Sequence, residues 1–400
     1  MKKYLVLFTC MLALFISFAA FSEETKSEAE LLKEKYEERA FKCLNTLTKY
    51  LVDDLSVYGT TNEFVKKSDA WNAMFEYDGG WFAGNNGKTV KNLRTDGWEK
   101  VSDTEFCVNV YCDYEVLYLR DREPVNYPCS YHFCFTQTDA RKDVWMVKDF
   151  HLLSNEWDVA HANKFTEENE GITVEPVIGK TFTGFMMIID DPSRVYVGTI
   201  PRFRTSSGGM RMDELVKLHG ALGGINGGGF DEGTGGSSRP SGIVYSMGEH
   251  KQTHMPNNFL TKVLMGFDEN NKLHVGTYTN KEVDALNLRD ALGFGPALII
   301  EGKAQNTGDT RNEFSARTAI GQDADGRVLM LVVRGRQPDS LGANMVDLIK
   351  IMQDYGAVNA GNLDGGNSTA MYLNEGIVYS AFRLESSRTL PAGFLIKKLP

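Results

Sequence analysis

The sequence of 400 residues has few of the residues that mark several classes of site. Its formal net charge is −10, so we expect neither a nucleic-acid-binding surface nor electrostatic docking on an anionic membrane. Only 6 Cys and 7 His occur, and no CxxC pair or Cys/His spacing indicates zinc. The two glycine-rich segments that begin at Asn226 and Asp364 do not contain the GK[ST] of a phosphate-binding loop, which argues against a nucleotide site there. We therefore expect no metal and no cofactor, although a divalent cation held by Asp364 or its neighbours is conceivable.

Long hydrophobic runs are absent except at the amino terminus. Two lysines precede an apolar run over residues 4–21, and an A-x-S cleavage site ends at Ser22. This order is typical of a cleaved signal peptide over residues 1–22. We therefore expect a secreted, periplasmic or cell-surface protein that has no contact with the membrane after cleavage. An uncleaved anchor is the alternative, because about 18 apolar residues can just span a bilayer.

The five cysteines that remain after signal cleavage all lie before residue 135. Four of them lie on two successive strand-like segments. If these segments form a hairpin, Cys107 faces Cys134 and Cys112 faces Cys129, because both pairs share one register. The sequence leaves open whether these pairs form two cross-strand disulfides or remain buried thiols, because disulfides between neighbouring antiparallel strands are often strained. An odd number of cysteines leaves at least one thiol free or in an intermolecular bond.

The first part of the chain predicts helices followed by an antiparallel sheet. Helical spacing runs from Glu23 to about Ser68, and alternation follows in FCVNVYCDYEVLYL, YPCSYHFCFTQ and VWMVKDFHLL. In element order this segment resembles the NTF2-like family of helix-plus-curved-antiparallel-sheet domains. The resemblance implies an accessory domain over residues 23–155, and a simple spacer or interaction domain is the alternative. The polar, acidic stretch that follows, residues 156–171, predicts a linker.

Residues 172–400 predict a second domain with far more glycine. FMMIIDDPSRVYVGTI predicts a hairpin, MRMDELVKLHG a helix that ends at Gly220, and RVLMLVV a buried strand. ANMVDLIKIMQDYG predicts a second helix, in which Asn344 and Asp347 form a capping box and Gly356 is the stop.

The two predicted helices of this domain are followed by similar segments. Each helix is followed by a tight turn, a short strand and then a glycine-rich segment that leaves the strand, which we call its exit. One exit begins at Asn226 and the other at Asp364. If the two short strands lie side by side in one sheet, Asn226 and Asp364 emerge at the same edge. Open α/β sheets bind ligands at such edges.

The glycine-rich exits, NGGGFD and LDGGNST, suit an anion, because glycine lets the backbone approach a ligand and present amide N–H groups to it. A third segment, SARTAIGQD, carries Arg317 and leads into the buried strand, after which Arg334 and Arg336 follow. In a chain this acidic, such arginines are candidates for paired hydrogen bonds to a phosphate.

Five ordered blocks resemble the phosphodiester glycosidase family. They are INGGGFDEG with PSGIV, GFGPALIIEGK, ARTAIGQDADGRVLMLVVRGRQ, LGANMVDLIKIMQDYGAVNAGNLDGGNST and SSRTLPAGFLI. The likeness covers about residues 181–398 and leaves out the first domain. It implies an α+β protein in which a mixed-sheet α/β catalytic domain spans residues 172–400. The chain departs from the family pattern at Asn367, where LDGGGS has its third glycine, which leaves pocket shape and substrate choice open.

The resemblance also implies an activity: hydrolysis of the anomeric C–O bond of a sugar-1-phosphodiester, such as an N-acetylglucosamine-1-phosphodiester. The expected partner of an exported enzyme is a phosphodiester-linked glycopolymer at the cell surface or outside the cell. A non-catalytic polysaccharide-binding protein is one alternative. Another is a phosphodiesterase that breaks the P–O bond instead and releases a sugar phosphate.

The resemblance assigns roles to particular residues. Asp364 is expected to be the nucleophile or base beside the anomeric carbon. Arg317 and Arg388 are expected to bind the phosphate. Asn226, with the backbone amides around Gly227 and Gly365, is expected to contact the sugar hydroxyls or the leaving oxygen. The other substrate-binding positions are Gly228, Thr318, Gly366 and Ser368, whereas Asp231 and Asp323 are expected to have roles in turns. One carboxylate together with arginines suffices for this hydrolysis, because a departing phosphate monoester is already a stable anion and protonating it matters less.

Overall fold

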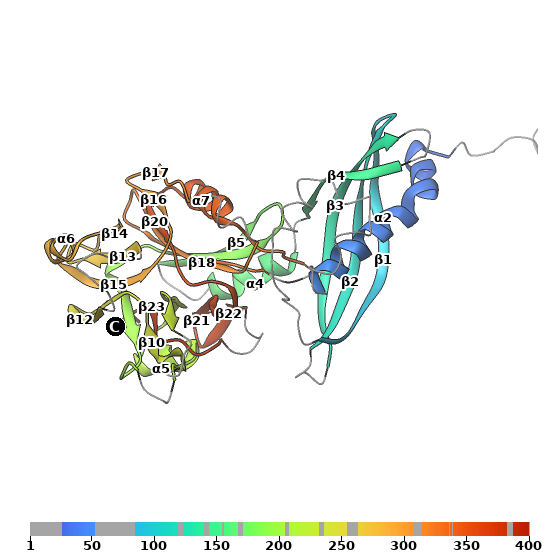
Figure 1. The fold of residues 1–400 in the computed structure, drawn as a ribbon. Helices are drawn as coiled ribbons and strands as arrows, with labels where there is room; N and C mark the ends of the chain where they lie inside the picture. Colours follow the sequence, from blue (N-terminus) through green and yellow to red (C-terminus); the bar gives the residue numbers. More distant parts are fainter. Residues whose placement is uncertain are drawn as a thin grey trace, which may run out of the picture.

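The structure is a computed structural model and consists mostly of β-strands with few helices (Figure 1). It describes residues 26–52, 85–118, 123–139, 144–153, 156–166, 171–204, 208–231, 236–253, 263–307, 314–335, 337, 339–381 and 387–399. The predicted signal peptide and Arg336 lie outside these residues. Within them, no helix is long and apolar enough to cross a membrane.

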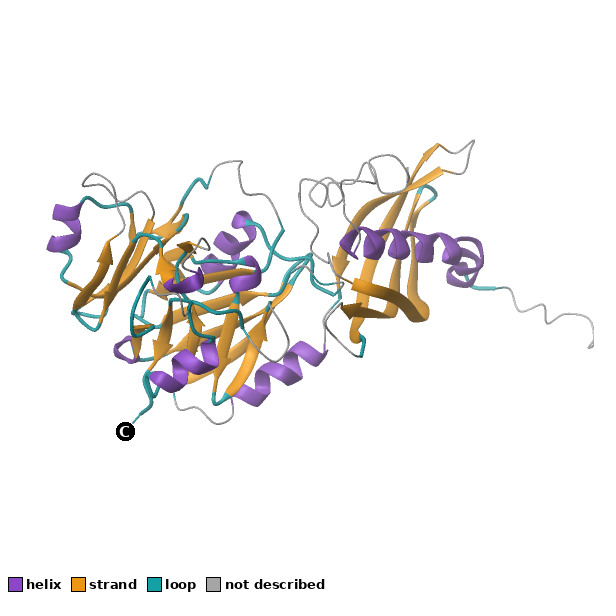
Figure 2. Ribbon diagram, turned by 60° about the horizontal axis from the view of Figure 1, so that its bottom comes forward, coloured by secondary structure: helices purple, strands orange, loops and turns teal. Residues whose placement is uncertain are grey.

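The amino-terminal part is a helix packed on a four-stranded antiparallel sheet (Figures 1 and 2). The elements are α2 (Glu28–Val52), β1 (Asn85–Ser102), β2 (Glu105–Tyr118), β3 (Val125–Asp139) and β4 (Val144–Leu152). Apolar residues on one face of the sheet pack against α2, where Tyr36 stacks on Phe106 with ring centroids 4.7 Å apart. The three predicted strands are present, and the NTF2-like assignment stays a prediction. Strand β1 was not predicted, because this edge strand has no apolar alternation in NNGKTVKNLRTDGWEKVS.

The predicted cysteine register is confirmed, because Cys107 lies opposite Cys134 and Cys112 opposite Cys129 in the β2–β3 pair. The first pair forms a disulfide. The second pair consists of free thiols buried in the core beneath α2. Burial raises the pKa of the Cys129 thiol, and its hydrogen bond with Cys112 raises it further.

The carboxy-terminal part contains three larger sheets that share one apolar core. The large sheet has the order β17 (Lys303–Ala304), β16 (Ala297–Ile300), β20 (Ala357–Asn362), β18 (Arg317–Asp323), β19 (Val328–Val333), β6 (Thr183–Ile189) and β5 (Ile172–Ile178). The β8 sheet has the order β22 (Gly376–Ser380), β21 (Ala370–Leu373), β8 (Gly223–Asn226), β23 (Ala392–Ile396) and β7 (Val195–Thr199). The β15 sheet has the order β12 (Glu249–Thr253), β11 (Ile243–Ser246), β15 (Leu288–Phe294), β13 (Val263–Asp268) and β14 (Leu273–Gly276).

Short elements complete this part. They are the ribbon of β9 (Phe230–Asp231) and β10 (Arg239–Pro240) and the 3-10 turns η2 (Pro192–Arg194), η3 (Gly236–Ser238) and η5 (Gly366–Ser368). One helix covers the outer face of each of these three sheets. Helix α7 (Met345–Asp354) covers the large sheet, α5 (Met212–Leu218) covers the β8 sheet and α6 (Asn280–Ala285) covers the β15 sheet. The helices predicted to end at Gly220 and Gly356 are confirmed as α5 and α7, and both glycines have positive φ.

The prediction of a mixed α/β sheet is wrong, because every strand pair in the described residues is antiparallel. The predicted hairpin around Pro192 is also wrong, since β6 pairs in the large sheet and β7 in the β8 sheet. In the same way, β8 and β20 belong to different sheets and do not lie side by side. Apolar alternation identified the strands, but it carries no information about which strands pair.

A helix, α4 (Glu156–Thr166), occupies most of the predicted linker. Its Ala162 is fully buried in the core between the sheets. Its Asp158 is also fully buried and forms an ion pair with Arg334, 3.1 Å long. The hydroxyl of Thr166 donates to the carbonyl of Val174 on β5. The polar composition that predicted a linker therefore reflects a helix whose polar side chains are partly used to attach it to the large sheet.

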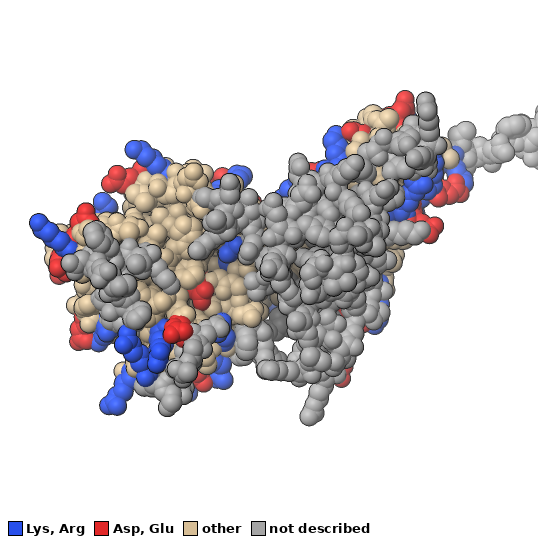
Figure 3. Space-filling view, in the orientation of Figure 1, with Lys and Arg blue, Asp and Glu red and all other residues tan. Residues whose placement is uncertain are grey.

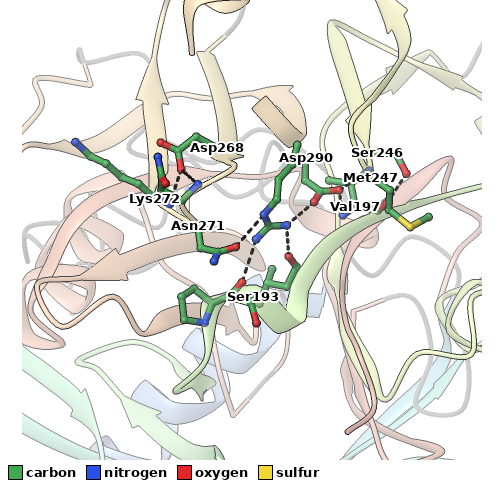
Figure 4. Close-up of polar contacts among 12 residues, drawn as sticks. Ser193, Val197, Ser246, Met247, Asp268, Asn271, Lys272 and Asp290 are labelled. Atoms are coloured by element: carbon green, nitrogen blue, oxygen red, sulfur yellow. Dashed lines mark hydrogen bonds and ion pairs between the residues drawn. The ribbon is translucent and has the colours of Figure 1, made fainter. Parts of the chain in front are cut away.

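A buried carboxylate, Asp290, joins two of the sheets (Figure 4). Its side chain is 1% exposed, and one oxygen accepts hydrogen bonds from the backbone of Val197 on β7 and of Met247 after β11. The neighbouring Arg289 donates to Asp290 and to the carbonyl of Val195. Desolvation raises the pKa of Asp290, whereas these donors lower it. The β8 and β15 sheets are thus held together by hydrogen bonds and an ion pair to one buried carboxylate.

Removing this carboxylate is expected to destabilise the protein strongly. The change Asp290→Ala leaves the buried amide of Val197 and the amide of Met247 without their acceptor and removes the carboxylate paired with Arg289, so we expect a loss of about 3–5 kcal/mol in the free energy of unfolding. The change Asp354→Ala, at an exposed end of α7, is the control and should alter stability by less than about 0.5 kcal/mol. Urea unfolding followed by circular dichroism measures both. Equal effects of the two substitutions would contradict the structural role of Asp290.

Candidate active site

The candidate site forms where β18 begins and β20 ends. These strands pair antiparallel, with Ala319 opposite Asn362. Beyond the last paired residues, the amide of Leu363 donates to the carbonyl of Thr318, and the amide of Gly366 donates to that of Ala316. These two bonds flank Arg317 on one segment and Asp364 on the other, so the arginine and the carboxylate lie on facing backbones.

The Arg317 side chain is held at its base. Its Nε donates to the carbonyl of Ala343, 3.0 Å away, just before α7. The side chain is half-buried, and its positive charge lowers the pKa of Asp347 in the first turn of that helix. Burial has the larger, opposite effect and raises the pKa of Asp347 overall. One edge of the guanidinium is therefore fixed to the chain while the group stays within reach of solvent.

Asp364 is also half-buried. Its Oδ1 accepts from the amide of Gly365, 3.0 Å away, and its own amide donates to the carbonyl of Gly227. The exits of β8 and β20 therefore meet, as the sequence predicted, although the two strands lie in different sheets. Among the described residues, no cluster of three or more metal-ligating side chains includes Asp364.

Asn226 fastens the two exits together. It is fully buried, and its Nδ2 donates to the carbonyl of Asp364, 2.7 Å away. Its Oδ1 accepts from the Thr318 hydroxyl at 2.7 Å and from the Ala370 amide at 3.0 Å. A contact between Asn226 and a sugar, as predicted, would break these bonds. The structure instead uses Asn226 and Thr318 to connect three segments of the site.

The glycines of both exits allow protein segments to approach each other. A Cβ on Gly228 would lie 2.4 Å from the carbonyl oxygen of Gly293, and one on Gly365 would lie 2.9 Å from that of Ala316. Gly227 is crowded in the same way by the backbone of Ala392. The amide of Gly365 donates to the Asp364 carboxylate and not to an open pocket. These contacts explain the glycines by close packing, and the anion-binding role of the amides around Gly227 stays a prediction.

The second exit keeps its turn despite the departure from the family pattern. Gly366 has φ of +57°, whereas Asn367 is not among the residues with positive φ. Asn367 is exposed, and Ser368 is buried with its amide donating to Gly365. The left-handed residue of this turn is therefore Gly366, and Asn367 needs no special conformation.

Arg388 lies at the other end of the first exit. Its guanidinium carbon is 4.9 Å from the centroid of the Phe230 ring, a cation–π contact. Both side chains are half-buried. On the same segment, Ser387 accepts from the Met212 amide and so ties this segment to α5. Phe230 was not predicted as a site residue, because a single aromatic in a glycine-rich segment gives no signal of its partner.

Three other charged candidates have structural roles. Arg334 is 6% exposed and pairs with Asp158 and Asp339, so its guanidinium is used inside the protein. Asp323 accepts from Arg327 in the β18–β19 turn, and Asp231 forms a long ion pair across the β9–β10 ribbon. The predicted turn role fits Asp323, whereas Asp231 lies on β9 opposite Arg239. The prediction that Arg334 is available to a phosphate is wrong.

The amino-terminal sheet contacts the segments behind Arg317. Phe314 and Leu341 are buried in the same apolar cluster as the inner face of that sheet. Phe314 precedes Arg317 by three residues, and Leu341 precedes the Ala343 carbonyl that binds Arg317 by two. In addition, Leu152 at the end of β4 donates to the Lys180 carbonyl. The two parts of the chain are thus packed together directly beside the candidate site.

On the face that Figure 3 shows, most of the coloured atoms of the carboxy-terminal part are uncharged. Lys and Arg lie mainly toward its edges, and some Asp and Glu lie nearer its middle.

Comparison with known proteins links this site to one family. The sequence model of the phosphodiester glycosidase family matches residues 219–397. The N-acetylglucosamine-1-phosphodiester alpha-N-acetylglucosaminidases of Mus musculus and Bos taurus are 38% and 41% identical over 63 residues, which are 16% of this chain and 12% of each relative. An uncharacterized prophage-derived protein of Bacillus subtilis, YomE, is 35% identical over 101 residues, 23% of this chain and 16% of its own. The matches thus span only a small share of these curated relatives.

Solved structures show weaker likeness. The zebrafish N-acetylglucosamine-1-phosphodiester alpha-N-acetylglucosaminidase catalytic domain, auto-inhibited by its pro-peptide, has a TM-score of 0.48 and 20% identity, with 58% of this chain and 85% of that chain covered. A hypothetical protein from Synechocystis has a TM-score of 0.42 and 14% identity over 78% of this chain and 81% of that chain.

Loss of the Asn226 side chain should lower the stability of the protein. The change Asn226→Ala leaves the Thr318 hydroxyl, the Ala370 amide and the Asp364 carbonyl without their partner, and we expect a loss of about 2–4 kcal/mol in stability. Asn367→Ala, on an exposed position of the same site, should cost less than about 0.5 kcal/mol. Thermal unfolding of both variants measures the difference. If Asn226→Ala were as stable as Asn367→Ala, the fastening role of Asn226 would be wrong.

Proposed function

We propose that this chain hydrolyses the bond between a sugar's anomeric carbon and a phosphodiester oxygen, since residues 219–397 match the sequence model of the phosphodiester glycosidase family. The observation that carries the proposal is the pairing of segments that brings Asp364 and Arg317 onto facing backbones. A carboxylate beside a guanidinium suits a substrate that has an electrophilic carbon next to an anionic group.

In the proposed reaction, a water molecule adds to the anomeric carbon and the bond from that carbon to the phosphate oxygen breaks. The electron pair of this bond stays on the phosphate, which leaves as a monoester. Asp364 either takes the proton from water or attacks the carbon first and is then released by water. The products are the free sugar and a phosphate monoester.

Arg317 is proposed to bind the phosphate. Its Nε is already bonded to the Ala343 carbonyl, so the guanidinium is oriented before substrate arrives. Charge that develops on the leaving phosphate then meets a cation that needs no reorganisation. Arg388 is proposed as a second phosphate ligand, with Phe230 as the surface on which its guanidinium lies.

Asn226 is proposed to act through Asp364 and not on the sugar. By holding the Asp364 carbonyl and the Thr318 hydroxyl, it fixes the backbone from which the carboxylate projects. Gly227, Gly228, Gly365 and Gly366 are proposed to shape the site by allowing close packing of its segments. Ser368 is proposed to support the turn after Asp364.

The cellular setting of the proposed enzyme rests on sequence. We propose export by a cleaved signal peptide and a phosphodiester-linked glycopolymer, of the N-acetylglucosamine-1-phosphodiester kind, as substrate. The amino-terminal part is proposed to be an NTF2-like accessory domain that supports the segments behind Arg317, because Phe314 and Leu341 lie in its core.

Replacing the carboxylate tests the chemical step. We expect Asp364→Asn to lower kcat at least about 1,000-fold on a sugar-1-phosphodiester, because a nucleophile or base is lost. The half-buried side chain changes little in size, so thermal stability should stay within about 1 kcal/mol of the parent. Release of free sugar measures activity, and Asp354→Asn on the exposed part of α7 is the control. Turnover by Asp364→Asn at the parental rate would refute the role, and sugar binding without turnover by the parent would favour a non-catalytic polysaccharide-binding protein.

Replacing the arginine tests phosphate recognition. Lysine keeps the charge but loses the bond to Ala343 and the paired geometry, so Arg317→Lys should reduce kcat/KM on a sugar-1-phosphodiester about 10-fold to 100-fold. The loss on a neutral aryl glycoside of the same sugar should be clearly smaller. Arg327→Lys, at the opposite end of the β18–β19 hairpin, is the matched control. Equal losses on the charged and neutral substrates would exclude a phosphate contact by Arg317.

A further inference from the structure

A cluster of sulfur and imidazole groups lies on the amino-terminal sheet, on the face opposite α2. The inner face presents the aromatic core, including Phe133 and Phe135. Cys134 and His132 alternate with these residues along β3, so they point to the other face. Cys107 on β2 lies opposite Cys134, and His151 on β4 lies opposite His132. Three neighbouring strands therefore bring two sulfurs and two imidazoles together.

The distance between sulfur and imidazole in this cluster fits a metal site, whereas the two sulfurs are joined in the disulfide. The ligand atoms of Cys107, His132 and Cys134 all lie within 4.8 Å of one another. Cys134 Sγ is 3.3 Å from His132 Nε2. A sulfur and a nitrogen bound to one tetrahedral zinc ion are about 3.5 Å apart, from bond lengths of about 2.3 and 2.0 Å. The rings of His132 and His151 lie next to each other, with centroids 4.7 Å apart, but His151 is not part of this three-residue cluster.

Hydrogen bonds fix the His132 tautomer that a metal requires. The Asp96 carboxylate accepts from Asn109 Nδ2 at 3.0 Å, which turns the Asn109 Oδ1 toward the imidazole. This oxygen is 2.8 Å from His132 Nδ1, so Nδ1 carries the proton and donates it. Nε2 then has a lone pair directed at Cys134. A histidine whose second nitrogen is held by an amide or carboxylate is the usual arrangement in metal sites.

We propose that the amino-terminal sheet holds a redox-dependent zinc site, formed by Cys107, Cys134 and His132 once the disulfide is reduced. A dithiol transfers two electrons and two protons to the Cys107–Cys134 disulfide, which gives two thiols, and the dithiol itself becomes a disulfide. Zinc then binds two thiolates and His132 Nε2, and two protons are released. In the oxidised protein the same strands are joined by the disulfide instead. Strands β2 and β3 are thus cross-linked in both redox states.

The second cysteine pair does not offer such a site. Cys112 and Cys129 are buried in the apolar core under α2, and the metal-ligating cluster in the described residues does not include them. Burial disfavours the thiolate that a metal needs and raises the pKa of Cys129. Each pair therefore serves as an internal control for the other.

Cobalt(II) is the probe, because its thiolate charge-transfer band reports sulfur ligation directly. The full chain is reduced with a phosphine, which does not bind cobalt through thiols, and titrated with cobalt and then zinc. We expect one equivalent of cobalt to bind the reduced protein, to be displaced by zinc, and not to bind the oxidised protein. Circular dichroism before and after reduction checks that the sheet persists.

Four variants test the assignment. The double change Cys107→Ser with Cys134→Ser should abolish the charge-transfer band, whereas Cys112→Ser with Cys129→Ser should keep it. His132→Ala and Asn109→Ala both retain the disulfide for folding, and after reduction each should weaken cobalt binding by about 10-fold to 100-fold. The proposal is overturned if the reduced parent binds no cobalt, if it unfolds and zinc does not restore it, or if the band depends on Cys112 and Cys129.

Discussion

The candidate site depends on a single strand pairing, between the start of β18 and the end of β20. Its last hydrogen bonds flank Arg317 and Asp364, so the register of the pair decides that these two residues lie on facing backbones. A shift of one residue would turn the side chains of one strand over relative to the other and so separate Arg317 from Asp364. Asn226 reinforces this register from a different sheet, since it bonds Thr318 on β18 and the Asp364 carbonyl after β20.

Much of the carboxy-terminal part was predictable because its local signals are strong. Capping at Asn344 and the stops at Gly220 and Gly356 place α5 and α7, and uninterrupted apolar residues place β19. Sheet membership was not predictable, because pairing depends on contacts between distant residues. Thus the sequence left open whether β8 and β20 share one sheet, and they belong to two sheets whose exits meet.

The roles of individual residues were also hard to predict wherever they depend on contacts between distant parts of the chain. The sequence brought together Asn226, Arg317 and Asp364 by resemblance, but it could not separate a side chain that faces substrate from one that holds the site together. Full burial and three internal hydrogen bonds show that Asn226 holds segments together. Arg334 is a further case: it resembled a phosphate ligand in sequence and is an internal ion-pair partner of Asp158, a residue of the predicted linker. Neither burial nor partners can be inferred from one residue's neighbours in the chain.

The site is supported from both parts of the protein: Phe314 and Leu341, which lie on the segments that lead to Arg317 and to its partner Ala343, are buried in the amino-terminal core, and Asn226 binds the Asp364 carbonyl. The central claim is that these supports present a carboxylate to an anomeric carbon and a guanidinium to a phosphate. Hydrolysis of a sugar-1-phosphodiester in oxygen-18 water tests it most directly, with mass spectrometry of both products. The account predicts the label in the hydroxyl group of the released sugar and none in the phosphate. Label in the phosphate would show attack at phosphorus and contradict it.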